Sequence, residues 1–183
     1  MNTPFIKTTA FRDVRIERIM SALKTSDLND LCDAADSAIL AGGGFGWVKM
    51  PERVVMERYW QGVVTVPHRI LLVARLEGVI AGALQIIRPQ LNNEAQKMSV
   101  QFTHHFTAPW ARKSGLAKAL LLEAEAIARE EGYDVVNLDV RETMTGAIKL
   151  YESHGYELIG VHPAYAKVGD QFVKGHYYYK RLD

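Results

Sequence analysis

The sequence predicts a mixed α/β fold, and two observations carry this prediction. Residues 96–107, 116–130 and 135–140 read in succession as a strand, an amphipathic helix and a second strand. Two strands joined in this way are parallel neighbours with a right-handed crossover. Residues 69–74 and 79–87 read instead as strands on either side of Glu77-Gly78, a two-residue hairpin signal. The predicted sheet therefore combines a parallel pair with antiparallel strands.

The N-terminal part of the chain adds one strand and two helices to this core. Residues 13–19 alternate in polarity as a strand does. Ser26 or Asp27 is expected to cap a helix that reaches about residue 41, where the run Gly42-Gly-Gly-Phe-Gly46 ends it. Pro51 suits the first position of a second helix that reaches about residue 60.

The C-terminal part begins with the amphipathic helix of residues 116–130. One face of this helix is apolar. The opposite face carries the charged residues Lys118, Glu123, Glu125, Arg129 and Glu130. Gly132 ends this helix, and a shorter one follows at residues 145–153. Residues 156–161 and 171–179 read as the last strands, with a long connection through Pro163 and Gly169 between them.

Composition limits the class of protein. We expect residues 1–183 to form a single domain, because this length suffices for one core. A net charge of +1 gives no support to a nucleic-acid partner. The lone Cys32 excludes an intrachain disulfide and reads as a buried structural thiol. No apolar run approaches the ~20 residues of a membrane span, and no histidine, cysteine or carboxylate group has metal-ligand spacing. These features predict a cytoplasmic protein without a metal site.

The segment from Thr107 to Ala117 leads from strand to helix and has the composition of a phosphate-binding turn. Small residues at Gly115 and Ala117 let phosphate oxygens approach the backbone. The N–H groups and positive dipole end of the helix, with the Arg112 and Lys113 side chains, favour a pyrophosphate. Taken alone, the pattern Arg-x-x-Gly-x-Ala also fits an ordinary strand-to-helix turn.

Three motifs in order give the chain a family resemblance. They are Pro109-Trp-Ala-Arg112-Lys-Ser-Gly115-Leu-Ala117, Leu138-Asp-Val-Arg-Glu142, and Ala147-Ile-Lys-Leu-Tyr151-Glu-Ser-His-Gly155-Tyr156. Together they resemble the core of the GNAT superfamily of acyl-CoA-dependent N-acyltransferases. The C-terminal third is also similar, more faintly, to the tabtoxin-resistance type of small-molecule acetyltransferase.

The resemblance implies a fold, a co-substrate and a binding site. The implied fold is a mostly antiparallel central sheet with flanking helices, in the order β-α-α-β-β-β-α-β-α-β-β, whose parallel strand pair splays apart. Acetyl-CoA is the implied co-substrate, held in the V between the strands that end near Thr107 and Val140. Its pantetheine arm and pyrophosphate would be bound by Phe106, Thr107, Ala108, Arg112, Lys113, Ser114, Gly115, Leu116 and Ala117. Homodimers are common in the superfamily, although no interface is visible here.

Transfer of an acyl group to an amine needs a base for the amine proton and an acid for the leaving thiolate. The Leu-Tyr pair of the third motif implies that Tyr151 is the acid. A packed aromatic residue on an amphipathic helix is the alternative interpretation of Tyr151.

Asp139 is the leading candidate for the base. Leu138 and Val140 share one face of their strand, so Asp139 points to the other, where the parallel strands should part. Related protein N-terminal acetyltransferases carry a glutamate base twelve residues before the tyrosine, and the shorter aspartate would act through water. A strand-end carboxylate in a salt bridge is the alternative.

The preceding strand offers competing candidates. Many family members have a glutamate where this chain has Gln101, and an amide cannot accept the proton, so Gln101 is expected to hydrogen-bond the substrate. His104 and His105 are alternative bases, and alternation places one on each face. Met144 stands where the family usually has an asparagine that binds the cofactor arm or the loop.

The acceptor is less well defined. Phe45, Trp47, Tyr59 and Trp60 either line an acceptor pocket or pack the helices onto the sheet. We expect the primary amine of a small molecule, because the segment of residues 161–173 can close over a compact acceptor. A protein N-terminal or lysine acetyltransferase, which needs an open groove, is one alternative. A non-catalytic acyl-CoA sensor is the other, favoured by Gln101 and Met144.

Overall fold

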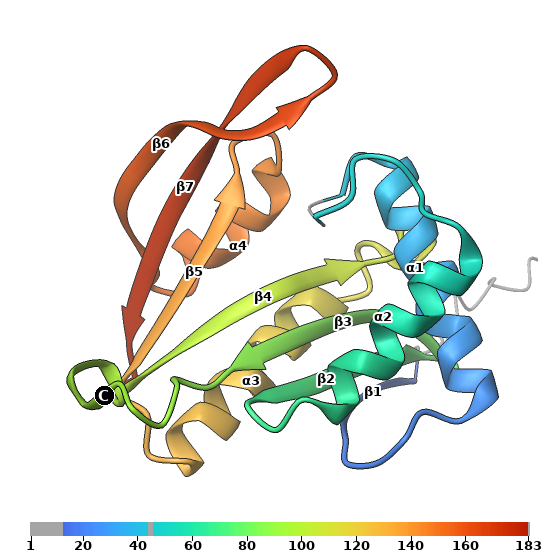
Figure 1. Ribbon diagram of the computed structural model, residues 1–183, viewed down its shortest axis with the longest axis horizontal. Coiled ribbons are helices and arrows are strands. Elements are labelled where there is room, and N and C mark those ends of the chain that lie inside the picture. The colour runs from blue at the N-terminus through green and yellow to red at the C-terminus, as the bar shows by residue number, and fades with distance from the viewer. Residues whose placement is uncertain (1–12, 44–45, 183) are drawn as a thin grey trace, which may run out of the picture.

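Seven strands form one sheet in the computed structural model, which describes residues 13–43 and 46–182 (Figure 1). In spatial order they are β1 (Val14–Ile19), β2 (Arg69–Leu76), β3 (Val79–Ile87), β4 (Ser99–Thr107), β5 (Val135–Arg141), β7 (Gln171–Arg181) and β6 (Glu157–Val168). Of the strand pairs in these residues, only β4 and β5 run parallel. The prediction of a mostly antiparallel sheet with one parallel pair is confirmed, as is the order of the elements.

Helices cover both faces of the sheet. α1 (Thr25–Leu40) and α2 (Arg53–Thr65) pack on one face around Leu31, Met56 and Trp60. α3 (Leu116–Glu130) and α4 (Thr145–Ser153) pack on the other, where Leu120, Leu121 and Tyr151 join the larger core. The site must lie where these two layers leave the sheet uncovered.

The parallel pair separates after a short contact. β4 and β5 are paired only from Ser99 to Phe102 and from Val135 to Leu138, and beyond these residues the two strands diverge (Figure 1). A β-bulge adds to the bend, because His104 has φ +50° and two residues of β4 oppose Leu84 of β3. The divergence leaves one backbone edge of β4 without a strand partner.

Two helix starts differ from the sequence prediction. Lys24 is the N-cap of α1, so neither Ser26 nor Asp27 caps it, and Asp27 instead forms an ion pair with Arg75 at 3.1 Å. α2 begins at Arg53, two residues after Pro51, and continues to Thr65. This ion pair with a residue of β2 is a tertiary contact, which the local sequence does not indicate.

The predicted long connection before the last strand is wrong. β6 continues to Val168, and only Gly169 and Asp170 separate it from β7. Pro163 is tolerated because β6 is an edge strand whose pairing is irregular between His162 and Ala166. The segment expected to close over the acceptor is therefore part of a long hairpin.

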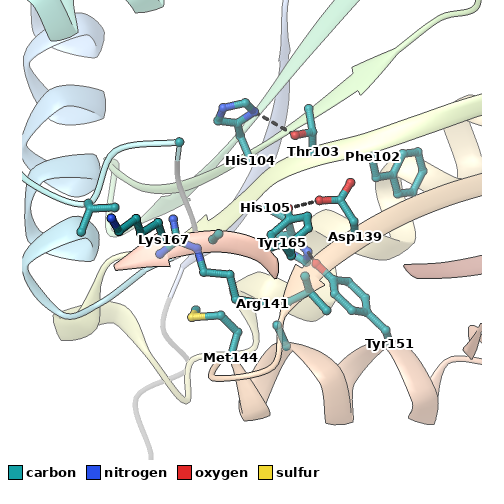
Figure 2. A pocket seen from close by; sticks show the side chains of 15 residues that line it. Phe102, Thr103, His104, His105, Asp139, Arg141, Met144, Tyr151, Tyr165 and Lys167 are labelled. Carbon is teal, nitrogen blue, oxygen red and sulfur yellow. Dashed lines mark hydrogen bonds between the residues drawn. The ribbon is translucent and has the colours of Figure 1, made fainter. Parts of the chain in front are cut away.

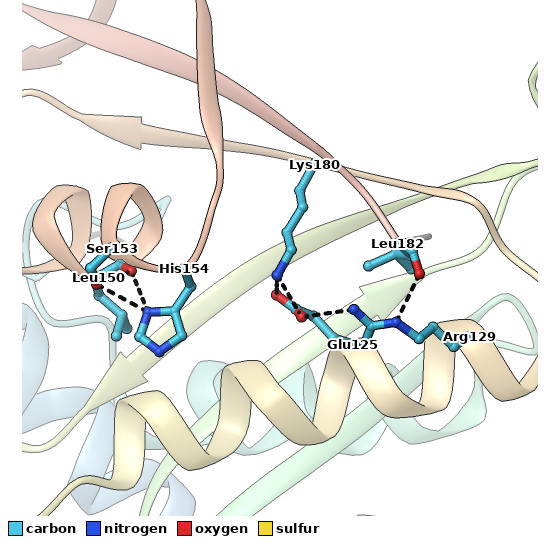
Figure 3. A network of polar contacts seen from close by, with 7 residues as sticks. All are labelled: Glu125, Arg129, Leu150, Ser153, His154, Lys180 and Leu182. Atoms are coloured by element: carbon cyan, nitrogen blue, oxygen red, sulfur yellow. Dashed lines mark hydrogen bonds and ion pairs between the residues drawn. The ribbon is translucent and has the colours of Figure 1, made fainter.

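A buried ion pair attaches this hairpin to α3. Glu125, expected on the charged face, is only 2% exposed, and the Lys180 Nζ lies 2.8 Å from each of its carboxylate oxygens (Figure 3). Arg129 donates to the Leu182 carbonyl at 2.9 Å. In the same view His154 donates to the Leu150 carbonyl at 2.7 Å at the end of α4.

None of the helices in the described residues is long and apolar enough to cross a membrane.

Candidate active site

The turn before α3 has the geometry of an anion site. Gly115 precedes the first residue of the helix with φ +86°, a left-handed conformation that residues with a Cβ adopt only under strain. The first N–H groups of α3 have no partner within the helix and carry the positive end of its dipole. Arg112 and Lys113 are exposed beside them. The turn therefore offers backbone donors and two cations to the same space.

A cavity of about 630 Å³ lies against this turn, and we call it the donor cavity. The open edge of β4 forms one side of it, through residues 105–107. The turn before α3, the first turns of α3 and α4, Met144 before α4, and residues 38–43 at the end of α1 line the other sides. Arg112, Lys113, Gly115, Leu116 and Ala117 all line it.

Two of the expected cofactor residues do not reach the donor cavity. The N–H of Ala108 donates to the Ala81 carbonyl at 2.7 Å and its carbonyl accepts from Ala111 at 2.9 Å, so both backbone groups are occupied. The Ser114 hydroxyl donates to the Ala111 carbonyl. Phe106 lines the cavity, but its ring packs on Trp60 in the core. The stretch of β4 that borders the cavity is therefore residues 105–107, and it begins one residue earlier than expected.

A second cavity of about 400 Å³, the acceptor cavity, lies between the diverged halves of β4 and β5 (Figure 2). Thr103 and His104 line it from β4, Asp139 and Arg141 from β5, and residues 165–167 from β6. His105, Met144 and Ala147 line both cavities. The two cavities therefore adjoin at the fork of the sheet.

Asp139 is the first residue of β5 beyond its pairing with β4, and it lies on the face opposite Leu138 and Val140. Its Oδ1 accepts a hydrogen bond from the Gln101 Nε2 at 3.1 Å. Its Oδ2 accepts one from the Tyr165 hydroxyl. A carboxylate has about four acceptor positions, so Asp139 retains capacity for a further donor.

Gln101 thus contacts Asp139 and does not line the acceptor cavity. Tyr165 was missed by the sequence reasoning, which assigned it to a connection. Burial and the Asp139 charge raise the pKa of Tyr165, so its hydroxyl stays protonated and donates.

A glycine makes the Tyr165 contact possible. A Cβ on Gly175 of β7 would lie 2.1 Å from the Tyr165 ring, so the ring rests directly on the glycine backbone. Gly175 pairs with Arg141 on β5, and from this position the Tyr165 side chain reaches back to Asp139. Neither residue stands out in the sequence, because their contact depends on the β6–β7 register.

Tyr151 and His105 form a buried pair at the junction of the cavities. The His105 Nε2 lies 3.0 Å from the Ala117 carbonyl, which can only accept, so this nitrogen carries the proton. The Nδ1 therefore accepts from the Tyr151 hydroxyl at 3.1 Å. Burial lowers the pKa of His105 to about 4 and, together with the Asp139 charge, raises the pKa of Tyr151. Both side chains are uncharged at neutral pH.

The two histidines lie on opposite faces of β4, as predicted. His104 packs on the Tyr59 ring at 5.6 Å, and its Nδ1 lies 3.0 Å from the Thr103 hydroxyl. Burial and the nearby Arg69 lower its pKa to about 4. A histidine with so low a pKa is a weak base.

The described aromatic side chains near α2 pack against one another and in the core, and do not line the acceptor cavity. Trp60 is fully buried and does not line the acceptor cavity, which favours the packing alternative. Trp47 packs edge-on against Tyr59, and neither residue lines the acceptor cavity. The Tyr59 hydroxyl accepts from the buried Gln85 at 2.8 Å. Phe45 lies outside the described residues.

Comparison with known proteins identifies the family. The description "Acetyltransferase (GNAT) family" matches residues 40–156. An uncharacterized N-acetyltransferase encoded in the hisH-hisA intergenic region of Azospirillum brasilense is 60% identical over 131 residues, which are 72% of this chain and 77% of the relative. The chain belongs to the GNAT family. It is therefore an acyl-CoA-dependent N-acetyltransferase, and the acetyl donor of this family is acetyl-CoA.

Solved structures agree on the fold. An N-acetyltransferase from Staphylococcus aureus Mu50 superposes with a TM-score of 0.77 and 18% identity, over 93% of this chain and 99% of that one. The Salmonella typhimurium protein yncA, solved with its cofactor acetyl-CoA, has a TM-score of 0.73 and 15% identity over 93% and 94% of the two chains. Within the described residues of this GNAT protein, no group of three metal-ligating side chains is close enough to hold an ion.

Proposed function

We propose that this GNAT protein, as a single N-acetyltransferase domain of residues 1–183, transfers an acetyl group from acetyl-CoA directly to the primary amine of a small molecule. One observation carries the proposal: two adjoining cavities share His105, Met144 and Ala147 at the fork of the sheet. The donor cavity has the chemistry for a pyrophosphate, and the acceptor cavity has a carboxylate. Two reactants held in contact in this way gain most of their rate advantage from proximity.

The donor cavity suits acetyl-CoA. The N–H groups at the start of α3, with Arg112 and Lys113, would bind the pyrophosphate. The edge of residues 105–107 that faces away from β3 would pair with the pantetheine amides. The thioester would then reach the shared residues. Met144 offers it a soft apolar contact in place of an amide.

Asp139 is our candidate for the base, because it is the only acidic residue among the described residues that line the acceptor cavity. As the amine nitrogen bonds to the thioester carbon and the C–S bond breaks, a proton on nitrogen passes to Asp139, directly or through water. Gln101 and Tyr165 orient the carboxylate by donating to it. The histidines are poorer choices, because both ring nitrogens of His105 are already hydrogen-bonded and the Nδ1 of His104 lies against a hydroxyl.

Tyr151 is our candidate for the acid. Its raised pKa keeps the phenol protonated, and its hydroxyl lies at the junction where the thiolate would leave. The hydroxyl turns from the His105 Nδ1 to the sulfur and gives up its proton there. His105 holds the hydroxyl in position until then.

A small acceptor fits the volume. About 400 Å³ lies near the lower end of the range of about 300–1,000 Å³ for small-molecule pockets. Residues 165–167 of β6 add a side to the cavity that an open peptide groove would lack. A cytoplasmic location and a homodimer stay predictions of the sequence.

Release of free thiol from acetyl-CoA with a panel of small amines tests the proposal. Asp139→Asn and Tyr151→Phe should each lower kcat by about 10²-fold or more, with the acetyl-CoA Kd unchanged in calorimetry. Asp134→Asn, one residue before β5, and Tyr156→Phe beside Tyr151 are the matched controls and should retain kcat. Acetyl-CoA binding without turnover of any amine would support the sensor alternative instead.

A further inference from the structure

Two cationic side chains in the acceptor cavity have no role in the transfer step. Arg141 of β5 and Lys167 of β6 both line this cavity, and neither lines the donor cavity. In the view of Figure 2 both extend to the side of the pocket away from the Asp139 carboxylate. The cavity therefore has an acidic end and a basic end.

The fold fixes Arg141 relative to Asp139. The two residues are separated by one position on β5, so their side chains leave the same face of the strand, about 7 Å apart at the backbone. Gly175 pairs with Arg141, and the Tyr165 ring lies on that glycine. Tyr165 thus stands beside both ends of the cavity, since its hydroxyl donates to Asp139 and its ring lies on the glycine that pairs with Arg141.

Lys167 carries a positive charge for which the described residues offer no ion pair. The one carboxylate among the described lining residues, Asp139, already accepts hydrogen bonds from Gln101 and Tyr165. His104 and His105 add no charge near neutral pH. A bound molecule with a negative group at the basic end would complement this arrangement.

We propose that Arg141 and Lys167 bind a carboxylate of the acceptor, and that the acceptor class is a free amino acid. This inference rests on the proposed function. The amine is held at Asp139 for transfer, and the carboxylate lies across the cavity against the guanidinium fork and the ammonium group. The Arg fork matches a carboxylate through two parallel N–H bonds, and Lys adds a point charge.

Thiol release with paired acceptors tests this assignment. The probes are L-α-amino acids and ω-amino acids, each beside its carboxamide, which keeps the amine and removes the negative charge. Wild type should favour one or more acids over their amides by about 10-fold or more in kcat/KM. In the double variant Arg141→Gln/Lys167→Gln, the KM for these acids should rise by about 100-fold, because charge-assisted hydrogen bonds are lost at two side chains.

The controls separate this proposal from the proposed function. The double variant should keep its acetyl-CoA Kd and its KM for the amides. Lys149→Gln, an exposed lysine of α4 outside both cavities, should behave as wild type. Equal use of acids and amides by wild type, or equal loss of both in the double variant, would overturn the carboxylate site and leave the transferase intact.

A binding measurement decides the case in which no acceptor is acetylated. Saturation-transfer NMR with the same amino acids, recorded on the protein with coenzyme A bound, needs no turnover. An amino acid that binds wild type and not the double variant supports the site even if the proposed transfer fails. Absence of binding by every acid overturns it.

Discussion

The two cavities at the fork differ in what builds them. The donor cavity is formed mostly by backbone groups and small side chains from two short stretches, residues 105–118 and 143–147. The acceptor cavity takes most of its polar side chains from β4, β5 and β6, which the sheet brings together from distant parts of the chain. Local sequence therefore determines the donor cavity, and long-range register determines the acceptor cavity.

The donor turn and the β6 side of the acceptor cavity also differ in how well they are packed against the core. The donor turn leads directly into α3, whose apolar face is fully buried in the core. The β6 side of the acceptor cavity belongs to an edge strand whose residues are mostly exposed. Few buried contacts mean low local stability. Substitutions near β6 should thus affect the acceptor while leaving donor binding intact.

The largest expected effect is on donor binding, from Gly115→Glu. The substitution forces a side chain into a backbone with φ +86° and adds a negative charge where the pyrophosphate would bind. We expect the acetyl-CoA Kd to rise by about 100-fold or more in calorimetry, because charge-assisted bonds to phosphate are lost.

Gly132→Glu is the matched control for this change. Gly132 ends the same helix with φ +82°, and a Cβ there meets no neighbour within 4 Å, as at Gly115. The two variants should lose similar stability, since the backbone strain is alike, but only Gly115→Glu should lose acetyl-CoA. Equal Kd values in the two would refute the anion site at the start of α3.

A smaller effect is expected at the acceptor cavity from Gly175→Ala. The new Cβ would meet the Tyr165 ring at 2.1 Å, so the ring must leave the strand and withdraw its hydroxyl from Asp139. We expect kcat to fall by about 10-fold, since a hydrogen bond to a charged group contributes about 1.5–3 kcal/mol, with an unchanged acetyl-CoA Kd.

Gly160→Ala on β6 is the control for Gly175→Ala, because its Cβ would meet no atom within 4 Å. It should leave kcat unchanged. Tyr165→Phe should reproduce the loss seen with Gly175→Ala. A Gly175→Ala protein with wild-type kcat would show that Tyr165 does not support Asp139.

Local patterns sufficed for much of the fold. Glu77 and Gly78, with φ +52° and +85°, form the expected hairpin turn between β2 and β3. Gly132 ends α3 in the left-handed conformation that its sequence indicates. Apolar periodicity failed where tertiary contacts overrode it. Glu125 reads as a surface residue, and its burial depends on Lys180, 55 positions further along the chain.

The residues of the candidate site likewise fall into two groups, those placed by local sequence and those placed by strand pairing. The positions of Gly115, Tyr151 and Asp139 follow from motif and strand pattern, since each is set by its own element. Arg141 lies in the same motif and on the same strand face as Asp139, but Tyr165 and Lys167 carry no local signal. Their place in the acceptor cavity depends on the pairing of β7 with β5 and β6, and on a glycine small enough to lie beneath a tyrosine ring.

The smallest expected effect concerns His105, which belongs to both cavities. Its folded pKa of about 4 lies below the value of about 6.5 expected in the unfolded chain, so between these pH values the unfolded chain binds a proton that the folded one does not. Stability should therefore fall as the pH drops from about 6.5 toward 4, and be unaffected by His105 above that range.

Urea unfolding near pH 7.5 and pH 4.5 measures this contribution, which should be about 2 kcal/mol for a fully buried histidine. His105→Gln should be less stable at neutral pH, because the Tyr151 and Ala117 contacts are altered, but should lose less on acidification. His68→Gln, at an exposed position, should keep the full loss. If His105→Gln lost as much stability on acidification as wild type, the wild-type imidazole would be able to take up a proton within the folded protein. A neutral His105 between Tyr151 and the donor turn would then not be required to hold the two cavities next to each other.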